Sequence, residues 1–272
     1  MRKLSLFLLL FWNLALYAGG ENHPIGARAA GLGQAAITLT DVWSAHHNQA
    51  GLGYIRRFSA GAYYESRFLV PELGLSGLAV AMPVGKGALG LSIRNFGYQL
   101  YQENKIGLGY GRRFGDQWSI GMQLNMHTVT FQEPYGSTIA VSAEVGAQYR
   151  VGKSVTLAAH VFNPTQTRLA EFDNERIPSA IRFGAQYRFS PKVFVVGEIE
   201  SSLYTKPSMR AGFEYRPVEA LYVRAGLAGS PFNSCFGFGV RWKRLQMDFA
   251  GTFHQVLGFT PRFSLTFQPG EE

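Results

Sequence analysis

The chain has 272 residues, of which 14% are aromatic, 16% are charged and 32 are glycine, and its mean hydropathy is −0.03. A single cysteine, Cys235, excludes a disulfide framework and a thiolate metal cluster. The formal net charge is +8, but the basic residues are scattered singly rather than in a run or a basic helix, so no nucleic-acid partner is expected.

The first 20 residues have the three parts of a secretory signal peptide. Arg2 and Lys3 supply the positive start, residues 4–18 form an apolar run, and small residues follow at 18–20. The run is too short to span a membrane comfortably, and no later stretch approaches the roughly 18 apolar residues of a membrane helix. We therefore expect an exported chain whose membrane residence, if any, is through a β-barrel.

Residues 21–57 precede the first expected strand and contain small residues at regular positions. Asp41 is a candidate N-cap for a short helix through His47, and residues 48–51 turn the chain toward the first strand. The motif residues of this segment are Gly26, Ala27, Arg28, Gly31, Gly33, Asp41, Asn48, Ala50 and Gly51.

Residues 58–268 repeat a unit of about ten residues in which apolar and polar or glycine positions alternate. Period-two alternation places the two sets of side chains on opposite faces of a strand. The expected strands are 58–68, 72–84, 87–96, 102–114, 117–131, 137–151, 154–162, 178–189, 192–203, 208–216, 220–229, 233–242, 245–254 and 260–268, followed by a tail at 269–272.

The links between these strands alternate strictly between tight turns and longer loops. Tight turns occur at Gly85-Lys86, Gly115-Asp116 and Gly152-Lys153, whereas residues 163–177 form the longest loop. An outer-membrane barrel has short periplasmic turns, longer outside loops and an even number of strands. A sandwich with Greek-key crossings has no such alternation. The sequence therefore predicts an all-β, antiparallel transmembrane barrel of about 14 strands.

Aromatic residues collect on the apolar face near the short turns, as in the interfacial girdle of a barrel. They are Phe114, Trp118, Tyr149, Tyr187, Phe189, Tyr215 and Trp242. The alternating, aromatic-ending segment 263–267 is typical of a closing strand.

The polar faces turn charges of both signs into the lumen, where we expect them to pair. This expected lumenal charge network comprises Arg94, Glu144, Arg150, Arg182, Glu198, Arg210, Glu214, Arg224 and Arg241. A lumen of 14 strands is intermediate between the filled eight-stranded barrels and the open porins. Residues 21–57 are the natural candidate to fill it as a hatch.

No pattern of enzymatic chemistry stands out. The glycine-rich stretches 31–33 and 107–111 lack the strand-to-helix context of a phosphate loop. His46 and His47, as neighbours on a helix, point about 100° apart and rarely share a metal ion. We expect no catalytic residues, no metal site and no cofactor.

The pattern G-A-R-A-A-G-L-G-x-A from Gly26, the short acidic-capped helix and N-x-A-G-L from Asn48 resemble the PorV/PorQ family. That family is similar to the FadL fatty-acid transporters, and the resemblance implies a 14-stranded barrel with the N-terminal segment inside as a hatch. It also implies an accessory role in type IX protein secretion or gliding.

Three roles remain open: this non-enzymatic secretion role, a FadL-like channel for small hydrophobic molecules, and a purely structural barrel. The charged loop 163–177 favours the secretion role over capture of a lipid. The implied location is the outer membrane of a Gram-negative cell. The implied partners are outer-membrane lipid and, through the resemblance, type IX secretion proteins or secreted cargo.

Overall fold

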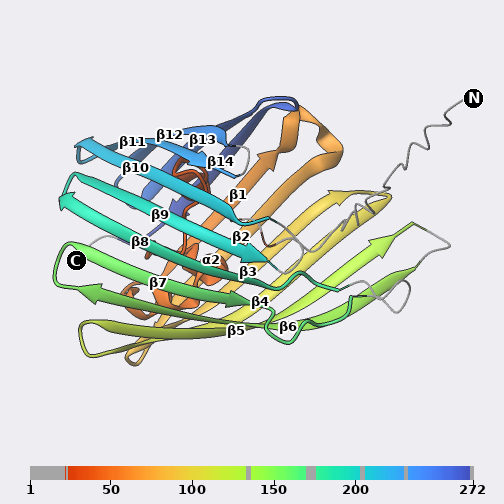
Figure 1. Ribbon diagram of the computed structural model, residues 1–272, viewed down its shortest axis with the longest axis horizontal. Coiled ribbons are helices and arrows are strands. Elements are labelled where there is room, and N and C mark those ends of the chain that lie inside the picture. Colours follow the sequence, from red (N-terminus) through yellow and green to blue (C-terminus); the bar gives the residue numbers. More distant parts are fainter. Residues whose placement is uncertain are drawn as a thin grey trace, which may run out of the picture.

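The computed structural model describes residues 22, 24–132, 136–169, 176–202, 206–229 and 232–269. Its strands form one closed antiparallel barrel, in which β1 (Ser59–Ser66) pairs with both β2 and β14 (Figure 1). The predicted fold class, an all-β barrel of 14 strands with the N-terminal segment inside, is confirmed. The expected signal peptide, residues 1–20, and residues 270–272 of the expected tail lie outside the described residues.

Each strand occupies its predicted position to within two residues at either end. The remaining strands are β2 (Gly74–Val84), β3 (Gly87–Tyr98), β4 (Tyr101–Phe114), β5 (Trp118–Phe131), β6 (Ser137–Val151), β7 (Val155–Phe162), β8 (Ala180–Ser190), β9 (Val193–Ser202), β10 (Ser208–Val218), β11 (Leu221–Ala228), β12 (Asn233–Trp242), β13 (Leu245–His254) and β14 (Gly258–Phe267).

Alternation along each strand separates an apolar outer face from a polar inner face. On β5 the side chains of Met122 and Leu124 are 62% and 66% exposed, whereas Gln123 and Asn125 are 2% and 1% exposed. The outer residues would face lipid, and the inner ones are covered by the contents of the lumen. Apolar side chains thus lie outside and polar ones inside, the reverse of a soluble protein.

The two ends of the barrel differ in the length of their connections. The short turns gather at one end, at the left of Figure 1, and Gly115 (φ 62°) and Gly152 (φ 61°) take the left-handed conformation that such turns need. At the long-loop end, two 3₁₀ turns, η2 (Arg67–Leu69) and η3 (Pro71–Leu73), follow β1, and they replace the strand ends predicted at 67–68 and 72–73.

Aromatic rings on the outer face pack in pairs beside the short turns. The ring centroids of Trp118 and Tyr149 lie 4.4 Å apart, and those of Tyr187 and Phe189 lie 4.7 Å apart. Phe189 and Trp242 are exposed on the same face. This arrangement is the one expected of an interfacial girdle.

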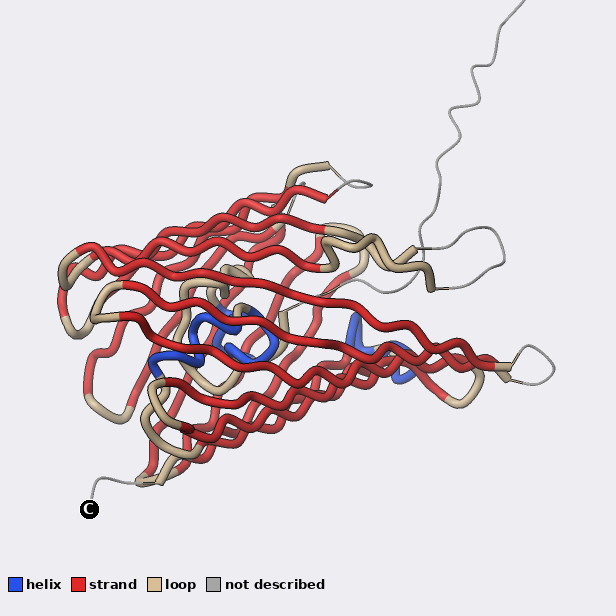
Figure 2. The backbone as a smooth tube through the Cα atoms, turned by 90° about the horizontal axis from the view of Figure 1, so that it is seen from below, coloured by secondary structure: helices blue, strands red, loops and turns tan. Residues whose placement is uncertain are grey.

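The N-terminal segment lies inside the barrel as a chain of short helical turns, drawn blue within the red strands of Figure 2. Its elements are α1 (Ala27–Gly31), α2 (Ser44–His47) and the 3₁₀ helix η1 (Gln49–Tyr54). Helices of this length are not stable alone in water, so their order comes from packing against the wall. We call residues 24–57 the hatch.

The predicted N-cap at Asp41 is wrong. Helix α2 begins at Ser44 rather than directly after Asp41, and no side chain caps it. The Asp41 Oδ1 atom accepts the N–H of Trp43 at 3.0 Å in the turn before the helix. Its other carboxylate oxygen lies 3.1 Å from Nη1 of Arg28, so the side chain links two parts of the hatch.

In the part of the chain that the structure describes, none of the helices has both the length and the apolar character to cross a bilayer.

We expect Leu124→Arg, near the middle of β5, to lower the free energy of unfolding by about 2–4 kcal/mol, because it places a cation on the lipid face. Val151→Arg, on the same outer face beside a short turn, should cost about 1 kcal/mol or less. Denaturant unfolding of the protein in phospholipid vesicles measures both values. Equal costs at the two positions would show that the outer face does not contact lipid.

Candidate functional site

The hatch sits directly on glycines of the barrel wall. Gly212 and Gly226 lie against the backbone of Leu32 and Gly33, and a β-carbon at either wall position would overlap the hatch. Gly33 itself has φ 65°, and a β-carbon there would lie 2.6 Å from the carbonyl oxygen of Ala211. The hatch and the wall therefore touch backbone to backbone on this side.

The other side of the hatch is seated in the same way on β4 and β5. Gly111 and Gly121 leave room for the backbone of Gln49, and the Ser119 hydroxyl donates to the carbonyl of Ala50 at 2.6 Å. Asn48 is fully buried, its side chain donating to the Ile37 carbonyl at 2.9 Å and accepting from the N–H of Ala50 at 3.1 Å. Asn48 thus ties two turns of the hatch together at the wall.

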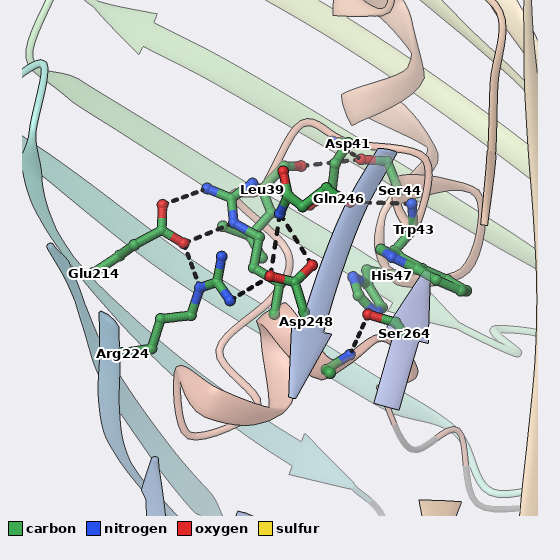
Figure 3. A network of polar contacts seen from close by, with 12 residues as sticks. Leu39, Asp41, Trp43, Ser44, His47, Glu214, Arg224, Gln246, Asp248 and Ser264 are labelled. Atoms are coloured by element: carbon green, nitrogen blue, oxygen red, sulfur yellow. Dashed lines mark hydrogen bonds and ion pairs between the residues drawn. The ribbon is translucent and has the colours of Figure 1, made fainter. Parts of the chain in front are cut away.

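Three ion-pair clusters connect the hatch to the wall, and the first is centred on Arg28. Its Nε and Nη2 donate to the two carboxylate oxygens of Glu214 at 2.9 and 3.0 Å, a bidentate pair. Arg224 contacts the same carboxylate at 2.6 Å and reaches Asp248 at 2.6 Å, as Figure 3 shows. Burial alone would lower the pKa of Arg28, but Glu214 and Asp41 raise it overall, so the guanidinium stays charged.

The second cluster is centred on Glu144, which is completely buried. Its carboxylate accepts from Nζ of Lys105 at 2.5 Å, from the Asn125 amide at 2.9 Å and from Gln49 of the hatch at 3.1 Å, and lies 3.0 Å from Nε2 of His160. Each of these contacts compensates part of the cost of removing the carboxylate from water.

The third cluster holds the middle of the hatch through Glu198. One oxygen of this carboxylate accepts the backbone N–H groups of Ala36 and Ile37 at 2.8 and 3.1 Å, and the other lies 2.8 Å from Nη1 of Arg210. Arg210 and Arg182 also both reach Glu200, at 3.0 and 2.5 Å. The wall thus supplies side chains that replace hydrogen bonds the hatch backbone would otherwise make to water.

Seven of the nine residues predicted for the lumenal network contribute to such buried pairs, and two do not. Arg94 pairs with Glu103 at 3.4 Å and completes the set formed by Glu144, Arg182, Glu198, Arg210, Glu214 and Arg224. Arg150 instead stacks on the Tyr54 ring, 3.4 Å from its centroid, and Arg241 donates to Gln246 at 3.0 Å. Both lie at the short-turn mouth rather than in the interior.

Lys105, Glu65 and Arg262 also belong to this interior, although they are absent from the network predicted from the sequence. Lys105 has the same inward parity as Gly107 and Gly109 on β4, so the alternation pattern could have placed it in the lumen. The glycines that share this face make it difficult to recognise as a polar, charged face from the sequence. Glu65 and Arg262 are direct cross-strand partners at the β1–β14 seam, with a side-chain contact of 2.9 Å. That pairing requires knowledge of which strands close the barrel.

His46 and His47 are both buried in the hatch, and His47 makes a hydrogen bond within it. Nε2 of His47 lies 2.7 Å from the carbonyl oxygen of Ile25, so it carries the proton. Burial lowers the pKa of His47 to about 4, which keeps the ring neutral at neutral pH. Among the described residues, no three His, Cys, Asp or Glu side chains are grouped so that they could hold a metal ion.

A cavity of about 630 Å³ lies between the hatch and the long-loop end. Its hatch side is formed by Pro24 and Gln34, together with Asn22 just before the hatch. The wall contributes apolar surface and paired charges: Phe68, Phe162, Ala180, Ala228, Glu65, Arg67, Arg182, Glu200, Arg210 and Arg262. This volume falls in the range of small-molecule sites, and its lining combines apolar surface with polar groups.

The backbone beside this cavity is strained. Phe68 and Leu69 in η2 have φ values of 54° and 60°, a conformation that residues other than glycine seldom adopt. The Phe68 N–H donates to the Thr260 hydroxyl at 3.1 Å, and its ring contacts His254 edge-on at 6.0 Å. Such strain persists only where surrounding contacts hold it, and it is concentrated at functional sites.

Comparison with known proteins identifies the fold but not a family. No family model matches the chain, and no curated protein matches it. Among solved structures, the Ralstonia pickettii toluene transporter TbuX is similar, with a TM-score of 0.72 and 12% identity over 92% of this chain and 99% of that one.

The Pseudomonas putida toluene transporter TodX has a TM-score of 0.71 at 10% identity, covering 93% of this chain and 100% of that one. A Pseudomonas aeruginosa FadL homologue has 0.65 at 12% identity, covering 90% and 98%. Two of these neighbours are toluene transporters and the third is a FadL homologue. The FadL-like part of the expected resemblance is therefore supported at the level of fold, whereas the finer PorV/PorQ assignment has no support from these comparisons.

We expect Gly33→Ala to displace the hatch from its seat and to raise ion conductance across planar bilayers, because the new methyl group overlaps the wall backbone. Gly85→Ala is the matched control: its φ of 60° imposes similar backbone strain, but no atom lies within 4 Å of the added carbon. Unchanged conductance in a correctly folded Gly33→Ala barrel would mean that the hatch does not close the lumen.

We expect Glu144→Ala to lower the free energy of unfolding by about 3–5 kcal/mol, because it leaves the buried Lys105 ammonium without its carboxylate. Glu219→Ala, on an exposed turn, should change stability by no more than about 0.5 kcal/mol. Denaturant titration of both variants in vesicles makes the comparison. Similar losses for the two variants would contradict a structural role for the Glu144 cluster.

Proposed function

We propose that this protein is a non-enzymatic, FadL-like channel of the outer membrane for small hydrophobic molecules. The observation that carries the proposal is the cavity of about 630 Å³ between the hatch and the long loops. It occurs in a barrel with the fold of toluene transporters. Fold alone does not assign a substrate, so the proposal depends on what the cavity can accept.

The cavity suits a ligand with an apolar body. Phe68 and Phe162 present aromatic faces, and Ala180 and Ala228 leave space beside them. Each arginine of the lining contacts a carboxylate: Arg67 and Arg262 share Glu65, and Arg182 and Arg210 share Glu200. With Lys206 also present, the lining carries net positive charge, so a ligand would meet apolar surface beside arginines that are held in ion pairs.

The hatch separates this cavity from the short-turn end, so transport requires part of the hatch or wall to move. The strained turn at Phe68 and Leu69 lies on the cavity wall and is tied to β14 through Thr260. It is a candidate for movement because a relaxed backbone there would be lower in energy than the observed one.

An accessory role in type IX secretion is the second candidate, and the hatch motif from Gly26 to Leu52 is the observation that favours it. The motif residues have clear structural duties here: Arg28 pairs with Glu214, and Gly33 fits against the wall. These contacts hold the hatch in the lumen, which both the channel role and the secretion role require. The charged loop that favoured secretion falls partly outside the described residues, at 170–175.

We expect Ala228→Trp to reduce uptake of a radiolabelled monoaromatic hydrocarbon into proteoliposomes, because the indole would occupy the cavity. Leu227→Trp is the matched control, since it adds the same side chain to the outer face of β11. Equal uptake by both variants and the unmodified protein would remove the cavity from the transport path.

Deleting the gene distinguishes the two candidate roles. The channel role predicts impaired uptake of the hydrophobic compound together with normal amounts and surface attachment of secreted proteins. The secretion role predicts the opposite pattern.

A further inference from the structure

The excess positive charge of this chain is concentrated at one end of the barrel. The interior clusters pair their cations with carboxylates, as in Arg28–Glu214, Lys105–Glu144 and Arg224–Asp248. The short-turn end, by contrast, carries many more basic residues than acids: among the described residues, Asp116 and Glu219 lie on its turns, and Asp41 and Asp248 line the pocket at that end. The net charge of +8 is therefore a property of that end rather than of the lumen.

Arginine recurs at one structural position on alternate strands. Each of β4, β6, β8, β10 and β12 runs toward the short turns and carries an inward-facing arginine at its last or nearly last residues. These residues are Arg113, Arg150, Arg188, Arg216 and Arg241, which we call the arginine ring. Outward-facing aromatics such as Phe114, Tyr149 and Trp242 flank them, so parity turns the arginines toward the aqueous mouth.

The arginine ring has little acidic compensation. Among the described residues, Arg113 alone of the five has an acidic partner, Asp116 at 3.7 Å, whose side chain is 95% exposed. Arg150 lies over the Tyr54 ring, and Arg241 contacts Gln246 and the ring of Tyr222. Like charges held together without counterions destabilise the folded protein, so this arrangement has a cost that a partner would relieve.

A second pocket adjoins the ring at the same end. It has a volume of about 280 Å³, and its lining combines the bases Arg28, Arg57, Arg241, Lys243 and Arg244 with the acids Asp41 and Asp248. Arg57 belongs to the last residues of the hatch, directly before β1. The basic surface therefore continues from the rim of the barrel onto the exit of the hatch.

We propose that the arginine ring is a docking surface for an acidic peptide segment of a partner protein on the short-turn side, which the barrel topology places in the periplasm. Neighbouring strands lie about 4.8 Å apart, so arginines on alternate strands are about 10 Å apart. A peptide in the polyproline-II conformation advances about 9 Å per three-residue turn and places every third side chain on one face, so carboxylates at that spacing can follow the ring. Arginine binds carboxylates in a bidentate manner, which suits such a contact.

Lipid headgroups fit this surface less well. Residues of the ring face the mouth, whereas the lysines that project from the turns, Lys86, Lys153 and Lys192, are better placed to reach phosphates of the bilayer. The two groups of residues therefore allow acidic-peptide binding and lipid binding to be separated experimentally.

The test uses the full chain in zwitterionic phosphatidylcholine nanodiscs and a short fluorescein-labelled poly-glutamate peptide, with a Gly-Ser peptide of equal length as the neutral probe. Fluorescence anisotropy should show binding of poly-glutamate that weakens with salt and no binding of the neutral peptide. The combined variant Arg150→Gln, Arg188→Gln and Arg216→Gln should weaken binding by about tenfold or more.

The combined variant Lys86→Gln, Lys153→Gln and Lys192→Gln removes the same charge from the turn tips and should weaken binding by less than about threefold. Heat-modifiable migration on gels confirms that both variants are folded. Equal losses in the two variants, or no binding by the unmodified protein, would overturn the proposal. Loss of peptide binding when the nanodisc contains anionic phosphatidylglycerol would assign the surface to lipid instead.

Discussion

The burial of many polar and charged side chains inside a closed wall is the constraint on which this structure depends, and the hatch supplies partners for several of them. A 14-stranded barrel leaves more space than its own side chains fill. The hatch occupies this space, and the wall holds it there through two kinds of contact. Glycines such as Gly212 and Gly121 bring the hatch backbone directly against the strands, and carboxylates such as Glu198 accept its N–H groups. Without these contacts, the same carboxylates and guanidiniums would face an incompletely filled lumen.

The clusters around Arg28 and Glu144 show what the buried charges contribute to the position of the hatch. Buried ion pairs contribute little net stability unless their remaining hydrogen bonds are satisfied. Here each cluster includes a hatch residue, Arg28 in one and Gln49 in the other, so the pairs specify where the hatch sits as well as holding the wall together. The arginines that line the cavity on the other side of the hatch are held in ion pairs with Glu65 and Glu200, and apolar surface beside them is available to a ligand.

Much of this architecture follows from the sequence because strand faces are governed by parity. Leu124 and Gln123 differ in exposure as their alternation predicts. The regular alternation of short turns and longer loops predicts that consecutive strands are neighbours around the barrel, as they are. The contacts of Asp41 could not be predicted from the local sequence. Instead of capping a helix, its carboxylate is shared between a turn and Arg28, thirteen residues away along the chain. Contacts such as Glu65 with Arg262 depend on closure between distant segments, which no local pattern encodes.

The position of the hatch in the chain has a consequence for assembly. Strand β1 begins at Ser59, immediately after the hatch, and it forms the seam by pairing with β14 from the far end of the chain. The hatch contacts β4 and β5 through η1 and β11 to β13 through α1, on opposite sides of that seam. Residues 55–58 join η1 to β1, the seam strand. This short linker keeps the hatch next to the seam while the seam forms. We therefore expect enclosure of the hatch and closure of the barrel to be coupled, so that a defect in seating the hatch also weakens the closure of the wall at the β1–β14 seam.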